Sequence, residues 1–165
     1  MFNRASSVAV ALLQGVSLDD LSRIDLSAVA IAGTLTTENL GIEHLTKNVI
    51  ANPHIRRLIL FGSEIPGHLP GDALLRFSEN GIDSKGRILS ARGARPVLKN
   101  LTLLESDHFK SQIEVTNLIG KTDVSFLAAR LADLKQLALP PYESGLRADL
   151  VEARRAAPAY RLKLD

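Results

Sequence analysis

A histidine in a glycine-rich loop is the residue best placed to do chemistry in this sequence. The loop covers residues 62–71 and directly follows the apolar run Leu58–Phe61. Its three glycines would let a large, flat group approach the backbone closely: Gly62, Gly67 and Gly71. His68 could then ligate a metal carried inside such a group, with Ser63 or Glu64 orienting its other ring nitrogen. The alternative is a solvated loop histidine with no ligand.

The same loop comes close to a phosphate-binding pattern. Gly62 and Gly67 have the separation of the two glycines in G-x-x-x-x-G-K-[ST]. His68 and Leu69 stand where that motif has its lysine and its magnesium-binding hydroxyl. Without them the phosphates lose a point charge and the metal loses a ligand, so the sequence argues against nucleotide hydrolysis. The G-x-G-x-x-G motif of nicotinamide-binding proteins does not occur either.

A second polar segment, residues 33–39, leads from a predicted strand into a predicted helix. Its threonine and asparagine side chains can cap the helix, and its glutamate complements the positive end of the helix dipole. This structural interpretation leaves the glycine and the surplus of small polar groups without a role, which a ligand would give them. The candidate ligand-binding residues of the segment are Gly33, Thr36, Thr37, Glu38 and Asn39.

A third segment, Ile88–Pro96, alternates small residues with arginines. It could be a loop and short strand whose arginines are solvated. It could also lie beside the histidine loop, with Ala91 and Gly93 forming the floor of a pocket. The remaining histidines are weaker candidates, because none forms an i, i+4 pair and their neighbours are charged or turn residues: His44, His54 and His108.

The elements that must position these loops alternate between β-rich and helical segments. Four short apolar runs predict strands, and the second and third are apolar enough for strands buried on both faces of a parallel sheet: Val8–Leu13, Val29–Ala32, Leu58–Phe61 and Ile113–Ile119. Spacing and capping signals predict the helices: Ile42–Val49, Pro70–Phe77, Thr102–Gln112 and Val124–Leu134. The order predicts an α/β, Rossmann-like, doubly wound and mostly parallel sheet, whose ligands gather beyond the carboxyl ends of the strands.

A single domain over residues 1–139 accounts for these elements, because no internal repeat and no second pattern of strands and helices follows. From Pro140 the pattern dissolves. Residues 140–165 are predicted to form an extended tail that lies on the domain or reaches towards a partner. Four arginines give this tail its basic character: Arg147, Arg154, Arg155 and Arg161.

Composition excludes several classes of function. The 165 residues contain no cysteine, so disulfide scaffolds, thiolate metal sites and cysteine nucleophiles are ruled out. A net charge of +2 and only seven aromatic residues argue against a nucleic-acid partner. No run of 18 apolar residues predicts a membrane span. The sequence therefore predicts a soluble, cytoplasmic protein.

Several segments, in one order, resemble the corrinoid-binding subunit of tetrahydromethanopterin S-methyltransferase. The resemblance covers roughly residues 7–135, the length of the family's soluble domain. It rests on these motifs: Ala30-Ile31-Ala32-Gly33, Thr37-Glu38-Asn39-Leu40-Gly41-Ile42-Glu43, Asn52-Pro53-x-Ile55-Arg56, Leu58-Ile59-Leu60 followed by Gly62-Ser63-Glu64-x-x-Gly67-His68-x-x-Gly71, Asn80-Gly81-Ile82-Asp83, and Ala91-x-Gly93-Ala94-x-Pro96.

The resemblance implies a Rossmann-like domain that carries cobalamin, a cobamide, with His68 as the lower axial ligand of cobalt. It implies a methyl carrier that works with a separate methyltransferase subunit, rather than a catalyst that acts alone. The residues that the resemblance and the three segments together assign to the corrinoid are Gly33, Thr36, Thr37, Glu38, Asn39, Gly62, Ser63, Glu64, Gly67, His68, Gly71, Ala91 and Gly93.

Two departures from the family bear on the partner. Family members of the membrane complex end in a transmembrane helix, whereas this chain ends in a polar tail at Asp165. Asp72 also occupies a position where the family often has glutamine. These differences predict a free-standing homologue whose partner is a methyltransferase of the methyl-tetrahydrofolate or methyl-tetrahydropterin type.

Two other functions remain open from the residues alone. The chain could be a degenerate Rossmann-like binding or regulatory module for a nucleotide or pterin, with no methyl transfer. In that case the loop glycines would matter for affinity and His68 would not. It could also be a structural interaction subunit that docks an acidic partner through the tail from Arg147 to Lys163.

Overall fold

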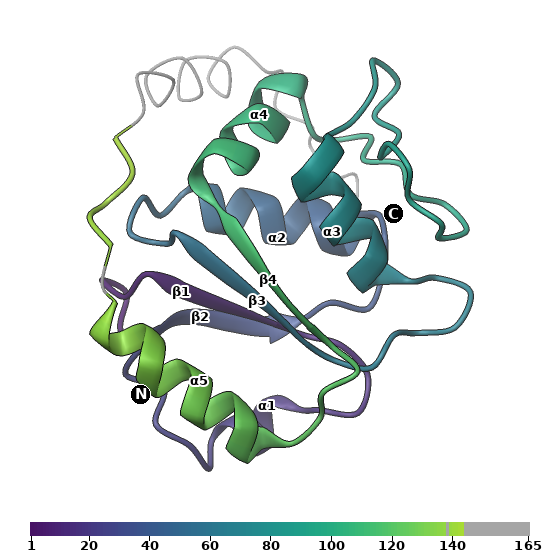
Figure 1. The fold of residues 1–165 in the computed structure, drawn as a ribbon. Helices are drawn as coiled ribbons and strands as arrows, with labels where there is room; N and C mark the ends of the chain where they lie inside the picture. Colours follow the sequence, from purple (N-terminus) through teal and green to yellow (C-terminus); the bar gives the residue numbers. More distant parts are fainter. Residues whose placement is uncertain (138, 144–165) are drawn as a thin grey trace, which may run out of the picture.

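A computed structural model describes residues 1–137 and 139–143 of the chain. Within these residues four strands and five helices follow one another, and Figure 1 shows them as a three-layer arrangement with the sheet in the middle. In chain order the elements are β1 (Val8–Leu12), α1 (Leu18–Leu21), β2 (Val29–Thr34), α2 (Leu40–Ile50), β3 (Arg57–Gly62), α3 (Pro70–Asn80), α4 (Leu103–Gln112), β4 (Glu114–Ile119) and α5 (Val124–Gln136).

The sheet is parallel throughout, with the strand order β2-β1-β3-β4. Helices α2, α3 and α4 cover one face, and α1 and α5 cover the other (Figure 1). This arrangement confirms the predicted α/β, Rossmann-like, doubly wound sheet. The chain winds outward from β1 in one direction and from β3 in the other. The carboxyl ends of β1 and β3 therefore flank the point where ligands bind in such sheets.

All four predicted strands are present, but the prediction that the second is buried on both faces is wrong. Strand β2 lies at the edge of the sheet, and only Val29 and Ala30 of its residues are buried. Ile31 is 40% exposed because no further strand flanks β2 and α2 stands partly away from it. The same prediction holds for β3, whose Leu58–Phe61 run lies between β1 and β4 with at most 1% of each side chain exposed.

The predicted helices follow the signals that marked them. Thr102 and Glu105 form a capping box at the start of α4, with each side chain accepting a hydrogen bond from the other residue's backbone amide. In α5 the apolar positions lie on one face, where Leu127, Leu131 and Leu134 are buried against the sheet. The short helix α1 was not predicted, because four residues are too few to show a helical period.

The first residues of the predicted tail lie against the amino edge of the sheet. The amide of Tyr142 donates to the carbonyl oxygen of Pro53 at 2.8 Å, and the guanidinium of Arg56 lies 5.4 Å from the Tyr142 ring centre. The arginine-bearing part of the tail, residues 144–165, lies outside the described residues. Among the residues that are described, no helix has both the length and the apolar character needed to cross a membrane.

Candidate functional site

Three loops meet beyond the carboxyl ends of the strands. They are the segment between β2 and α2, the segment between β3 and α3, and the part of the α3–α4 connection around residues 91–95. The amide of Ala94 donates to the carbonyl oxygen of Gly67 at 3.2 Å, and the amide of Arg95 donates to Glu38 Oε1 at 2.9 Å. The three segments that the sequence marked separately are therefore in direct contact.

His68 and Glu38 form the centre of this contact. The Nδ1 atom of His68 lies 3.1 Å from Glu38 Oε2 and 3.4 Å from Oε1. The carboxylate is buried, with 2% of its side chain exposed, whereas the imidazole is 57% exposed. A buried carboxylate thus holds one nitrogen of a histidine whose ring otherwise faces solvent. The expectation that Ser63 or Glu64 would orient His68 is wrong, because Glu38 occupies that position.

Glu64 is committed to the start of α3. Its carboxylate accepts hydrogen bonds from the amides of Gly71 at 3.1 Å and Asp72 at 2.5 Å. The residue at the N-cap position, Leu69, has a left-handed backbone (φ 49°) and makes no side-chain cap bond. Glu64 therefore supplies the cap that Leu69 cannot, and it places a negative charge at the positive end of the helix.

The resemblance of this loop to a phosphate-binding loop ends at the sequence. The amide of Ser63 donates to the carbonyl oxygen of Gln14 at 2.8 Å, and the Glu64 carboxylate already occupies the first amides of α3. Gly62 has a φ of +117° because its backbone passes close to Leu13 and Gln14. The groups that would cradle a phosphate are used within the protein, which argues against the nucleotide-binding alternative.

The loop glycines have different roles from one another. A β-carbon added at Gly67 would meet no atom within 4 Å, so this glycine faces open space, as expected of a residue beside a large ligand. A β-carbon at Gly71 would lie 2.8 Å from Glu64 Oε1, and one at Gly93 would overlap the backbone carbonyl oxygen of His68. Gly71 and Gly93 are thus required by packing inside the protein, and Gly93 brings the third loop onto the histidine.

An ion pair that the sequence did not indicate fixes the third loop to α3. Asp72 is 5% exposed and accepts from Arg92 through the Nη2 atom at 2.7 Å, the Nε atom at 3.1 Å and the backbone amide at 3.1 Å. Arg76 adds a weaker contact at 3.7 Å. Burial raises the pKa of Asp72, but the Arg92 hydrogen bonds and the two positive charges outweigh it and hold the pKa below 3.8.

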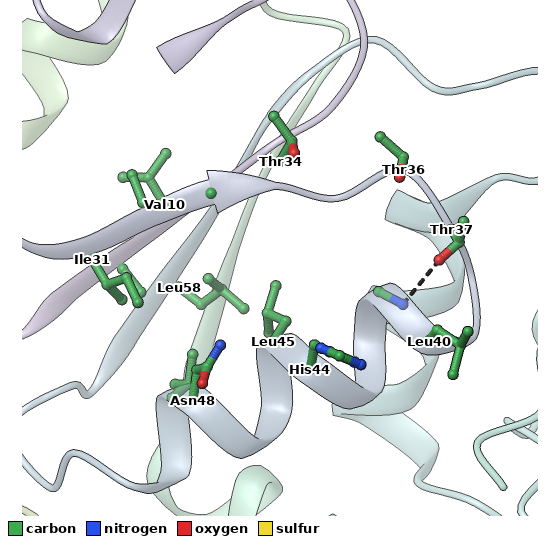
Figure 2. Close-up of a pocket in the computed structure, with 15 residues that line it drawn as sticks. Val10, Ile31, Thr34, Thr36, Thr37, Leu40, His44, Leu45, Asn48 and Leu58 are labelled. Carbon is green, nitrogen blue, oxygen red and sulfur yellow. Dashed lines mark hydrogen bonds between the residues drawn. The ribbon is translucent and has the colours of Figure 1, made fainter. Parts of the chain in front are cut away.

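A groove of about 540 Å³ lies beside this centre, between β2 and α2 (Figure 2). Three predicted site residues line it: Gly33, Thr36 and Thr37. His68 and Glu38 do not line it. The capping interpretation of this segment is confirmed in part. Thr37 Oγ1 accepts from the amide of Gly41 at 2.9 Å, and Asn39 Oδ1 accepts from that of Leu40 at 2.7 Å. The predicted site residues thus divide between a histidine centre and an adjoining groove.

Comparisons with known proteins give one result. The MtrA family, named for one subunit of tetrahydromethanopterin S-methyltransferase, matches residues 2–143. The corresponding subunit from Methanohalophilus mahii is 39% identical over 127 residues, which cover 77% of this chain and 52% of the relative. The one from Methanocaldococcus jannaschii is 44% identical over 123 residues, or 74% and 50% of the two chains. The chain thus spans about half the length of these two curated relatives.

A shorter relative is matched over more of its own length. It is the second of the numbered MtrA-type proteins of Methanothermobacter marburgensis, and it is 36% identical over 129 residues, which cover 78% of this chain and 68% of the relative. The matched residues include all of the strands and helices that surround the histidine centre and the groove.

Proposed function

The chain belongs to the MtrA family of tetrahydromethanopterin S-methyltransferase subunits, and from that premise we propose that it is a corrinoid carrier of methyl groups. The carrier works with a methyltransferase subunit that uses a methylated tetrahydrofolate or tetrahydropterin. When bound, the corrinoid supplies a cobalt centre that takes a methyl group from a donor and gives it to an acceptor. The protein's part is to hold the metal's lower side and to control the basicity of the ligand there.

The donor set at the site suits a metal that brings most of its own ligands. Among the described residues, no group of three or more His, Asp or Glu side chains could hold a bare metal ion. His68 offers a single imidazole, and a macrocycle that fills the in-plane positions of its metal needs only one such axial ligand. Gly67, beside His68, leaves open space in which a large ring meets no side chain.

The pair of Glu38 and His68 is the observation that carries the proposal. Because the Glu38 carboxylate is an acceptor, the neutral imidazole keeps its proton on Nδ1 and donates it to that carboxylate. The lone pair of Nε2 is then available to a metal, and no described residue bonds to that nitrogen. A buried carboxylate behind a metal-bound histidine fixes the ring and strengthens its nitrogen as a ligand.

The loop around residues 92–95 keeps this pair in place. Arg95 donates its amide to the second oxygen of Glu38, and Arg92 anchors the loop to the buried Asp72. A carboxylate with two donors and 2% exposure has little freedom to turn away from the histidine. We infer that the α3–α4 connection is the segment through which a partner would alter the basicity of His68.

Titration of the purified protein with cobalamin, followed by visible absorption, tests the proposal. We expect stoichiometric uptake with a shift of the cobalt bands that His68→Ala abolishes. His54→Ala is the matched control, because His54 lies in the turn before β3 at the opposite edge of the sheet. A shift that persists in His68→Ala would remove His68 as the ligand. No uptake by correctly folded protein would refute the carrier function itself.

A further inference from the structure

The floor of the groove between β2 and α2 is formed by residues with small or absent side chains. A shift in register between Val8 and Ala9 of β1 places Ala9 opposite Ile31 and Ala11 opposite Gly33. A β-carbon added at Gly33 would meet no atom within 4 Å. Helix α2 therefore has no bulky partner under this part of β2, and the space between them stays open.

The walls of the groove are apolar and its rim is polar. Ile31 and Leu58 project from the sheet and Leu45 projects from α2 into the space between them (Figure 2). His44 and Asn48 lie on the same side of α2 and are exposed (Figure 2). Exposed apolar residues in a concave site, with a few polar groups at its edge, are typical of a site for a small organic ligand.

The groove opens towards the histidine centre. Thr34, Thr36 and Thr37 form its end at the carboxyl edge of the sheet, and the next residue in the chain, Glu38, holds His68. One short loop thus serves both sites. A ligand fixed at His68 through its metal could place a side arm in the groove without any movement of this loop.

We propose that the groove binds the aromatic base at the end of cobalamin's nucleotide arm. This inference rests on the proposed function, since it requires a corrinoid at His68. In free cobalamin that base is itself the lower ligand of cobalt, so an imidazole from the protein leaves the base without a partner. Ile31, Leu45 and Leu58 offer it apolar contact, while His44 and Asn48 offer hydrogen-bonding groups at the rim. The volume of about 540 Å³ suits a base with its sugar.

The experiment compares cobalamin with cobinamide, which has the same ring but lacks the base and its sugar. Dissociation constants for both are measured by calorimetry on the wild type and on Gly33→Leu, which fills the floor of the groove. Gly33 has no positive φ and open space around it, so the larger side chain fits the fold. Ala129→Leu is the control, because Ala129 is an exposed residue of α5 on the other face of the sheet.

The expected result is a loss of cobalamin affinity of at least tenfold in Gly33→Leu, with cobinamide affinity unchanged within twofold. Ile31→Ala should show a smaller loss with the same selectivity, and Ala129→Leu should show none. Equal effects on both ligands, or no effect on either, would overturn the groove assignment and leave the carrier function standing. A folded protein that takes up neither ligand would overturn both.

Discussion

Gly93 offers the sharpest test of how the third loop is joined to the histidine centre. A methyl group at this position would overlap the backbone carbonyl oxygen of His68 and would lie 3.2 Å from Cγ of Glu38. The overlap is with backbone, so no rotamer change relieves it. In Gly93→Ala the two loops must separate, and the hydrogen bonds that join them at Ala94 and Arg95 must lengthen or break.

The size of the effect follows from the bonds at stake. The bond between the Ala94 amide and the Gly67 carbonyl is neutral and contributes about 1 kcal/mol net. The bond from the Arg95 amide to the buried Glu38 carboxylate contributes about 1.5–3 kcal/mol. Gly93→Ala should therefore lower the free energy of unfolding by about 2–4 kcal/mol.

Urea denaturation followed by circular dichroism measures this change. Gly33→Ala is the matched control, because its added methyl group meets no atom within 4 Å and its free energy of unfolding should stay within about 0.5 kcal/mol of the wild type. If Gly93→Ala unfolds at the same urea concentration as the control, the close contact between the loops does not exist as described. The geometry that fixes Glu38 against His68 would then be wrong as well.

Three further changes test the surroundings of the site. Glu64→Ala should destabilise the protein by about 1–2 kcal/mol in urea, since it removes the cap of α3 that Leu69 cannot supply. The pKa of Asp72 is held below 3.8, so its pair with Arg92 stabilises the fold above pH 3.8, and this contribution disappears as the pH falls through the lower, folded-state pKa. Asp72→Asn should therefore reduce the free energy of unfolding at pH 7 and flatten its dependence on pH below 4, and an unchanged acid limb in denaturation curves would contradict the pair. Thr102→Ala removes half of the capping box of α4 and should cost about 1 kcal/mol, measured in the same way.

The fold could be predicted from the sequence because its signals are local. The run Leu58–Phe61 is apolar at every position, as a central parallel strand must be. Thr102 and Glu105 mark the start of α4 within four residues of chain. The edge position of β2 could not be predicted, because strand order depends on how the helices pack across the sheet and not on the strand's own residues. Val29–Ala32 therefore looked as buried as β3.

The site could be predicted as three loops but not as one contact. His68 and Glu38 were both candidates, yet the bond between them joins positions 30 residues apart. Glu64 lies closer to His68 in sequence and was the more natural partner, but the left-handed backbone at Leu69 leaves α3 in need of its carboxylate. The Arg92–Asp72 pair spans 20 residues and has no periodic signal. The groove follows from a register shift in the sheet, of which the residue types give no sign.

Electron paramagnetic resonance of the protein loaded with cob(II)alamin tests the central claim most directly. The protein is made with ¹⁵N-histidine, so that a histidine ligand on cobalt carries a nucleus of spin one-half while the cofactor's own base keeps ordinary ¹⁴N. The account predicts superhyperfine doublets in the labelled wild type, triplets in the unlabelled protein, and no nitrogen splitting from the protein in His68→Ala. Triplets that persist in the labelled protein would show that the cofactor's own base remains on cobalt and would contradict ligation by His68.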